Sequence, residues 1–198
     1  MKTKLLFVDV ETSGLDPEKH GIIQFAASLD VGSHTYIDVD YKMKPFPEDE
    51  TSAETLAFHG ITETTLAGYL DPRDAFRQFK AELIKYIDPY NKKDKAFLIG
   101  YNAQFDDRFL RAWFKKNGDK YYGAYFWWPP IDVAVLLSMA YAKKRRDFPN
   151  FQLGTVVSVL EEVVDTTGFH DAAFDLKITK ALFYQVAELM SLDLGTGL

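Results

Sequence analysis

The pattern of apolar and polar positions changes its period along this chain of 198 residues. In the first quarter, apolar residues run continuously or alternate with polar ones, which is typical of β-strands. This pattern predicts strands over residues 4–10, 22–31 and 34–43. Further along, apolar residues recur three and four positions apart, as on the buried face of a helix. We therefore expect helices over residues 52–58, 72–87, 103–116, 133–142, 151–162 and 171–189, with strands at 96–101 and 128–132.

The helix that starts at Pro72 shows how a boundary is encoded. Asp71 is a residue type that caps helix N-termini, and proline is favoured at the first helical position. Strands at the start, followed by helices mixed with strands, predict an α/β fold with a mixed five-stranded sheet flanked by helices. The sequence contains no repeat or long linker, so we expect one domain over residues 1–190 and a flexible tail over 191–198.

Composition limits the class of protein. Hydrophobic residues make up 47% and aromatic residues 15% of the chain, which is enough for a core and excludes a disordered chain. No apolar stretch approaches the roughly 18 residues that a membrane helix needs, so we expect no membrane partner. The chain has no cysteine, which excludes disulfides, zinc–thiolate sites and cysteine nucleophiles and predicts a cytoplasmic protein.

The charge balance is acidic. Its net value is −6, from 23 basic and 29 acidic residues. This balance argues against a protein that coats nucleic acid electrostatically. It leaves open an enzyme whose clustered carboxylates hold divalent cations against a phosphodiester.

Two acidic residues close the first predicted strand. Side chains two residues apart in a strand point to the same face, so Asp9 and Glu11 project together with Phe7. The residues between them enter the other layer. Neighbouring carboxylates repel each other unless a cation lies between them. On its own, however, such a pair is most often a solvated strand end.

Two further segments place acids near the starts of helices. Asp106 lies in the first turn of the helix that follows an apolar strand, with Asn102 as the expected N-cap. Asp175 lies near the start of the last helix, five residues after His170. At about 100° per residue, these two side chains cannot share one helix face, so His170 must precede the helix if they converge. Read alone, each segment fits an ordinary helix start.

In combination, these segments resemble the DnaQ-like 3′→5′ exonucleases of the DEDD superfamily. The resemblance rests on residues 7–15 (FVDVETSGL), 58–62 (FHGIT), 100–110 (GYNAQFDDRFL) and 170–183 (HDAAFDLKITKALF). It extends over nearly the whole chain and implies an RNase H-like fold. A tyrosine branch of the superfamily carries tyrosine four residues before the last acid, where this chain has Asp171. His170, one residue earlier, matches the histidine branch, DEDDh.

The resemblance implies roles for the matching residues. Four acids would hold two divalent cations, Mg²⁺ or Mn²⁺, and these acids are Asp9, Glu11, Asp106 and Asp175. His170 would be the general base that takes a proton from the attacking water. Substrate contacts are expected at Thr12, Glu54, His59 and Asn102.

The implied activity is that of a metal-dependent 3′→5′ exonuclease, which releases nucleoside 5′-monophosphates from single-stranded DNA or RNA. The residues do not separate DNA from RNA, because 2′-hydroxyl discrimination depends on the shape of the pocket. Three alternatives stay open: an oligoribonuclease for very short RNA, a hydrolase of a small phosphodiester, and a non-catalytic nuclease fold that serves a polymerase. The sequence contains no polymerase domain, so a proofreading role would need a separate polymerase as partner.

Two residues depart from the family pattern. Gln24 stands where relatives often carry an acid, and we expect it to tune the surroundings of the metal site. Asp171 directly follows His170. If the Asp171 carboxylate faces the imidazole, it would favour the charged ring and displace the activity optimum to alkaline pH.

Basic and aromatic clusters are candidates for gripping the substrate. The basic clusters are residues 92–95, 115–116 and 143–146, and the last of them fits backbone phosphates best. Aromatic residues gather in 121–128, where some could stack on unpaired bases at about 1–3 kcal/mol each. Trp128, directly before Pro129, is expected to pack in the core.

Overall fold

The computed structural model describes residues 2–160 and 170–195 of the chain. Its strands are β1 (Lys4–Thr12), β2 (Ile22–Val31), β3 (His34–Lys42), β4 (Phe97–Gly100) and β5 (Ile131–Asp132). Its helices are α1 (Ala53–Phe58), α2 (Glu63–Ala67), α3 (Pro72–Leu83), α4 (Ala103–Lys116), α5 (Tyr122–Tyr125), α6 (Val133–Ala140), α7 (Leu153–Val159) and α8 (Ala172–Leu189), with a 3₁₀ helix η1 (Ala142–Asp147).

The five strands form one mixed sheet, which confirms the predicted fold class. Their order is β3-β2-β1-β4-β5, so β1 lies at the centre. The pairs β1–β2 and β2–β3 are antiparallel, whereas β1–β4 and β4–β5 are parallel. Parallel pairing brings the carboxyl ends of β1 and β4 to the same edge of the sheet. The segments that carry Asp9, Glu11 and Asp106 therefore meet at this edge.

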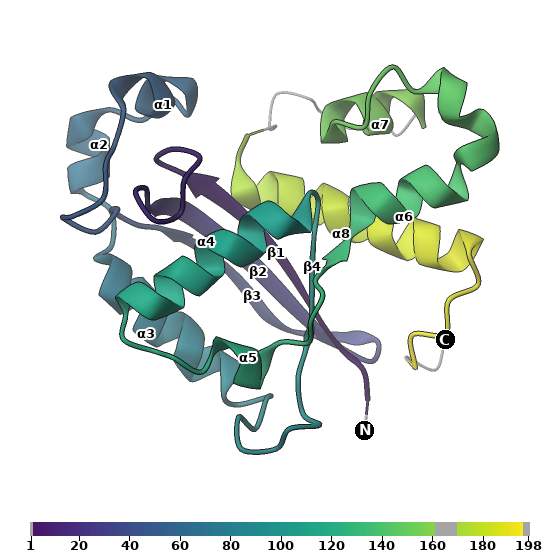
Figure 1. The fold of residues 1–198 in the computed structure, drawn as a ribbon, viewed down its shortest axis with the longest axis horizontal. Coiled ribbons are helices and arrows are strands. Elements are labelled where there is room, and N and C mark those ends of the chain that lie inside the picture. Colours follow the sequence, from purple (N-terminus) through teal and green to yellow (C-terminus); the bar gives the residue numbers. More distant parts are fainter. Residues whose placement is uncertain (1, 161–169, 196–198) are drawn as a thin grey trace.

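Helices cover both faces of the sheet and form two cores (Figure 1). On one face, α3 and α4 pack against alternate residues of β1, namely Leu6, Val8 and Val10. On the other face, α6 and α8 pack against Leu5 and Phe7. This alternation is the one that the two-residue period predicts. Because both faces of β1 are covered, polar side chains on it are confined to its ends: Lys4 at the amino end, and Asp9, Glu11 and Thr12 at the carboxyl end.

Several predicted boundaries differ from those of the structure. The helix from Pro72 ends at Leu83 instead of residue 87, and the strand predicted over 128–132 contains only two residues. The helix predicted from residue 151 starts at Leu153, and Asn150 accepts the Gln152 N–H at 2.9 Å in the turn before it. The short helices α2 and α5 were not predicted, because one turn is too short to show an apolar period.

The expected burial of Trp128 is wrong. Its side chain is 66% exposed, and the Arg111 guanidinium lies 5.5 Å from its ring centroid. The aromatic positions of the core in this region are filled by other residues, namely Tyr122, Tyr125 and Phe126. They pack against α4, which leaves Trp128 on the surface beside that helix.

The predicted tail has partial contacts with the domain. Leu194 packs against the core that α8 shares with the sheet, and residues 196–198 lie outside the described residues. The division into one domain and a flexible tail stays a prediction. Within residues 2–160 and 170–195, no helix combines the length and the apolar character needed to cross a membrane.

Candidate active site

Three carboxylates from two elements share one small volume at the carboxyl end of β1. Asp9 and Glu11 share one face of β1, as predicted, and α8 covers that face. On the same face, the buried Phe7 contacts Phe183 of α8, with 5.3 Å between ring centroids. Asp175 comes from the first turn of α8. One carboxylate oxygen from each of Asp9, Glu11 and Asp175 lies within 4.8 Å of the others, close enough to bind one metal ion.

Asp106 approaches the same strand from the opposite layer. It is buried in the first turn of α4, and its Oδ1 accepts a hydrogen bond from the Val10 N–H at 3.1 Å. Gly100 at the end of β4 leaves room for this carboxylate, because a Cβ at that position would lie 3.1 Å from Asp106 Oδ2. Asp106 is not one of the three carboxylates within 4.8 Å, but its charge acts on both Asp9 and Glu11.

Burial and mutual repulsion disfavour the charged forms of the four acids. Burial raises the pKa of Asp9 well above its ordinary value, and the charges of Asp106 and Glu11 raise it further. Burial, followed by the charges of Asp175 and Asp106, raises the pKa of Glu11 to about 8. Burial also raises the pKa of Asp106, to about 8, and that of Asp175. Hard divalent cations prefer carboxylate oxygens, so this donor set fits Mg²⁺ or Mn²⁺.

His170 lies just before α8, as its spacing from Asp175 predicts. Its backbone is left-handed, with φ of 72°, which is uncommon for a residue other than glycine. Its N–H donates to Asp175 Oδ2 at 3.3 Å. The side chain is exposed, and its ring is edge-on to Phe58 with centroids 4.9 Å apart. The structure thus brings the predicted base and the last acid together through one backbone contact.

Helix α1 brings His59 against the acids. His59 Nδ1 lies 3.5 Å from Glu11 Oε2, and the His59 side chain is only 8% exposed. Burial, followed by the charge of His170, lowers the pKa of His59, which favours the neutral ring. Among the described residues, Nδ1 has no hydrogen-bond partner. Phe58, which the sequence reasoning missed, contacts both imidazole rings, and its only signal was its place beside His59.

The other predicted substrate residues differ in their surroundings. Thr12 is buried, and its hydroxyl donates to the carbonyl of Gly14 at 2.7 Å. Glu54 is exposed on α1, and no described contact joins it to the acids. The prediction that Asn102 caps α4 with its side chain is wrong. Its backbone is left-handed, with φ of 60°, and its side chain makes no hydrogen bond to the first turn of α4. Its backbone N–H donates to Asp132 Oδ1 at 3.1 Å.

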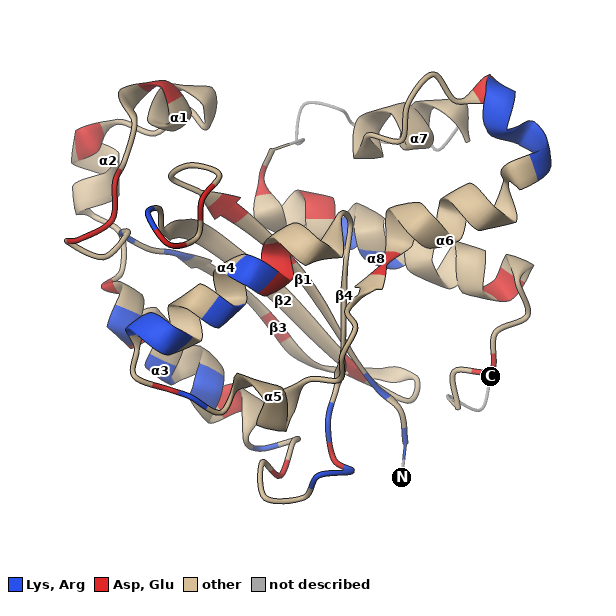
Figure 2. Ribbon diagram, in the orientation of Figure 1, with Lys and Arg blue, Asp and Glu red and all other residues tan. Residues whose placement is uncertain are grey.

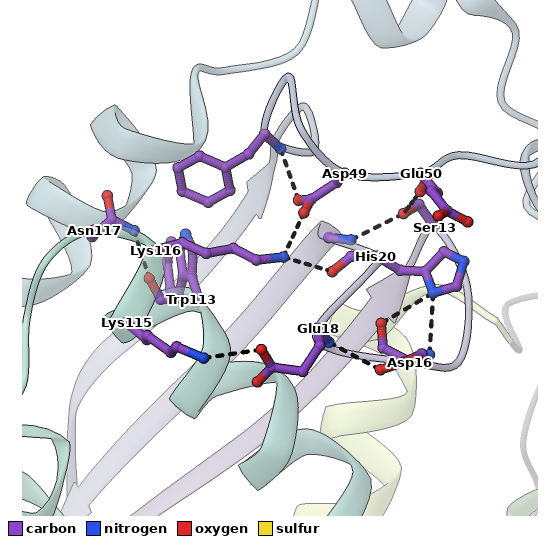
Figure 3. A network of polar contacts seen from close by, with 12 residues as sticks. Ser13, Asp16, Glu18, His20, Asp49, Glu50, Trp113, Lys115, Lys116 and Asn117 are labelled. Atoms are coloured by element: carbon purple, nitrogen blue, oxygen red, sulfur yellow. Dashed lines mark hydrogen bonds and ion pairs between the residues drawn. The ribbon is translucent and has the colours of Figure 1, made fainter.

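Polar contacts fix the loop between β1 and β2, next to the acids (Figure 3). The Ser13 hydroxyl donates to the Glu50 carbonyl at 2.8 Å. Lys116 of α4 donates to the His20 carbonyl at 3.0 Å and forms an ion pair with the buried Asp49. These contacts tie the loop to α4 and to the segment before α1.

The predicted basic cluster at 115–116 does not offer free cations to a substrate. Lys116 is taken up by Asp49, and Lys115 Nζ lies 2.9 Å from Glu18 Oε2. Residues 143–146, which we call the η1 basic cluster, are different (Figure 2). Three exposed cations of this cluster have no hydrogen-bond or ion-pair partner in the described part of the chain: Lys143, Lys144 and Arg146.

The condition for an alkaline optimum is not met, because the Asp171 carboxylate is turned to other groups. Its Oδ1 accepts the N–H groups of Ala173 and Phe174 as the cap of α8. Its Oδ2 accepts from Gln24 Nε2 at 3.2 Å and lies 3.5 Å from Lys42 Nζ. Burial alone would raise the pKa of Asp171, but the hydrogen bonds from Gln24 and Phe174, together with Lys42, lower it.

Comparison with known proteins gives consistent matches. A family model described as "Exonuclease" matches residues 6–183. The "DNA polymerase III PolC-type" of Thermotoga petrophila is 27% identical over 92% of this chain, which covers only 12% of that protein. The "3′-5′ DNA exonuclease Cap18" of Escherichia coli is 28% identical over 92% of this chain and 90% of its own length.

Among solved structures, E. coli Exonuclease I in complex with a dT13 oligonucleotide aligns with a TM-score of 0.74. The sequences are 20% identical over 96% of this chain and 42% of that chain, so the likeness shows the fold. This chain therefore spans less than half of Exonuclease I and a small part of the PolC-type polymerase.

Proposed function

Because this chain belongs to the exonuclease family, we propose that it removes nucleoside 5′-monophosphates from the 3′ ends of single-stranded DNA or RNA, using two Mg²⁺ or Mn²⁺ ions. The Cap18 relative is named a 3′-5′ DNA exonuclease and is matched over 90% of its length, which supports this polarity. The dT13 oligonucleotide held by Exonuclease I supports a single-stranded substrate.

The clustered carboxylates of Asp9, Glu11 and Asp175 are the observation that carries the proposal. Their oxygens lie within 4.8 Å of one another, and Asp106 supplies a fourth acid at the same strand end. A nuclease fold kept only for binding has no need to retain all four acids together with His170. The non-catalytic alternative is therefore not favoured.

Two bound cations would activate a water molecule and stabilise the leaving 3′ oxygen of the phosphodiester. In our proposal, the four acids hold the cations and His170 accepts the proton of the water, a contribution of about 10²–10⁴-fold. The exposure of His170 lets it pass this proton to solvent. Four residues are proposed to contact the terminal nucleotide: Thr12, Glu54, His59 and Asn102.

Partners and location are part of the same proposal. The PolC-type relative suggests that proofreading is one use of such a domain, and we propose a polymerase as a partner. We also propose a cytoplasmic location, because a chain without cysteine has no disulfide that an oxidising compartment would maintain.

The test uses single-stranded DNA and RNA of one sequence, each labelled at the 5′ end. With Mg²⁺, the protein should produce a ladder that shortens from the 3′ end, and EDTA should abolish it. Asp175→Ala should be inactive. Asp38→Ala is the matched control, because it removes an exposed aspartate of β3 outside the cluster. Failure of the wild-type protein to shorten either strand with Mg²⁺ or Mn²⁺ would contradict the proposal, whereas cleavage of only the shortest RNA would favour the oligoribonuclease.

A further inference from the structure

We propose that Gln24 is a positioning residue for this site: its side-chain amide holds Asp171, and through Asp171 the start of α8, over the sheet. The inference rests on the proposed function, since it concerns how His170 and Asp175 are set relative to the acids of β1. Gln24 itself touches none of the reacting groups in this scheme.

The Gln24 amide is held in one orientation. Gln24 pairs with Glu11 in the β1–β2 ladder, and its side chain is buried, with the residue only 6% exposed. Its Nε2 donates to Asp40 Oδ1 at 2.9 Å and to Asp171 Oδ2 at 3.2 Å. An amide nitrogen carries two hydrogens, so both donors are used. The amide therefore bridges two carboxylates, one on the sheet and one at the helix.

Asp171 joins this bridge to the first turn of α8. Its Oδ1 accepts the N–H groups of Ala173 and Phe174 at 3.1 and 3.2 Å, while Oδ2 faces Gln24. Its backbone carbonyl accepts the N–H groups of Phe174 and Asp175 at 3.0 and 2.9 Å. One oxygen of the carboxylate thus caps the helix and the other fixes the cap to β2.

Displacement of this cap would move His170, which precedes α8, and Asp175 of α8 together. His170 directly precedes Asp171, and its N–H donates to Asp175 Oδ2. Asp9 and Glu11 would not follow, because they belong to the central strand of the sheet. The contact between Gln24 and Asp171 therefore sets the distance between the two halves of the acid cluster.

The bridge requires an amide and does not tolerate a carboxylate. Glutamate at position 24 would have no proton to donate and would place a third negative charge between Asp40 and Asp171. Lys42 cannot offset this charge fully, because its side chain is 47% exposed and lies 3.5 Å from Asp171. Gln24→Glu should therefore be more harmful than Gln24→Met, which keeps the shape and removes the two hydrogen bonds.

The test compares the wild-type protein with Gln24→Glu, Asp171→Asn and the double variant. Asparagine caps helices as well as aspartate does, and its amide can donate to the introduced carboxylate. Gln24→Glu should lower kcat about tenfold or more, with KM little changed, and should weaken Mn²⁺ binding by a similar factor. The double variant should restore both to within about threefold of wild type. Gln78→Glu, the same change on the exposed side of α3, should alter neither.

Each result decides for or against the positioning role. A Gln24→Glu protein that melts earlier but keeps its kcat and Mn²⁺ affinity would show a merely structural contact, and so would a double variant without rescue. If Gln24→Glu does not fold, Gln24→Met must still lower kcat and Mn²⁺ affinity. The Mn²⁺ titration measures the affinity of the site for the metal, which depends on the placement of Asp175 and requires no turnover. An inactive wild-type protein would therefore refute the proposed function, while the titration would still test the bridge.

Discussion

Without bound metal ions, the free energy of unfolding of this protein should fall as the pH rises from 6 to 8. The pKa of Glu11 is raised from its ordinary value of 4.5 to about 8 by burial and by the charges of Asp175 and Asp106. Between pH 4.5 and about pH 8, Glu11 has lost its proton in the unfolded chain but still binds it in the folded protein. The free energy of unfolding must then fall as the pH rises. This is the opposite of the behaviour of a carboxylate in a salt bridge.

The expected slope follows from the number of protons involved. One such carboxyl lowers the free energy of unfolding by about 1.4 kcal/mol per pH unit. For a chain of this size, 1 kcal/mol corresponds to about 2–4 °C in Tm, so one carboxyl lowers Tm by about 3–6 °C per pH unit. Mg²⁺ replaces the protons on the acids, so its stabilising effect should increase over the same interval.

Thermal unfolding at pH 6, 7 and 8, in EDTA and in Mg²⁺, measures this slope. Asp175→Asn removes the charge that, after burial, contributes most to the raised pKa of Glu11. In EDTA this variant should therefore show a shallower slope and a higher Tm at pH 8 than wild type, and it should lose most of its response to Mg²⁺. Asp38→Asn, on the exposed side of β3, should behave as wild type. Equal slopes for wild type and Asp175→Asn in EDTA would refute the reasoning.

Three other outcomes are expected. Gly100→Ala pushes its new methyl group against Asp106 and should lower kcat at least about tenfold in the ladder assay; unchanged turnover would mean that the carboxylate adapts. Asp49→Asn leaves the half-buried Lys116 without its charge partner and should cost about 1–3 kcal/mol in chemical unfolding, whereas Lys115→Met, which removes an exposed pair, should change the unfolding midpoint little. Alanine at the three unpartnered cations of the η1 basic cluster should reduce the salt dependence of binding to a single-stranded 20-mer, by about 2 in the slope of log K against log salt, and leave dinucleotide turnover unchanged. An unchanged slope would mean that the single-stranded 20-mer does not bind at the η1 basic cluster.

Local periodicity was sufficient to predict how Asp9 and Glu11 are placed relative to each other and where His170 lies relative to the last helix. The alternation along β1 put Asp9 and Glu11 on one face because strand geometry depends only on neighbouring residues. The five-residue interval before Asp175 likewise required His170 to precede α8. The central elements of the sheet were predicted for the same reason, since each carries its own apolar run.

Contacts between distant segments could not be predicted in this way. Lys116 and Asp49 are 67 residues apart, and nothing in the basic run 115–116 shows that one of its cations is half-buried against a carboxylate. The position of the Asp171 carboxylate depends on Gln24, which lies on a different element. Trp128 was misplaced because the core has room for a limited number of rings, and the choice among neighbouring aromatic residues depends on packing against α4.

Asp106 and Asp175 come from opposite sides of the sheet, and this arrangement links metal binding to the assembly of both cores. Asp106 belongs to the layer of α3 and α4, whereas Asp175 arrives with α8 from the opposite layer. Ions held by both acids would therefore bind only a molecule whose two cores are assembled. A molecule in which α8 alone has opened keeps the other core but loses Asp175 and His170 together. Under the proposed function, such a partly open form would be unable to cleave nucleic acid, and hydrolysis would require the fully folded chain.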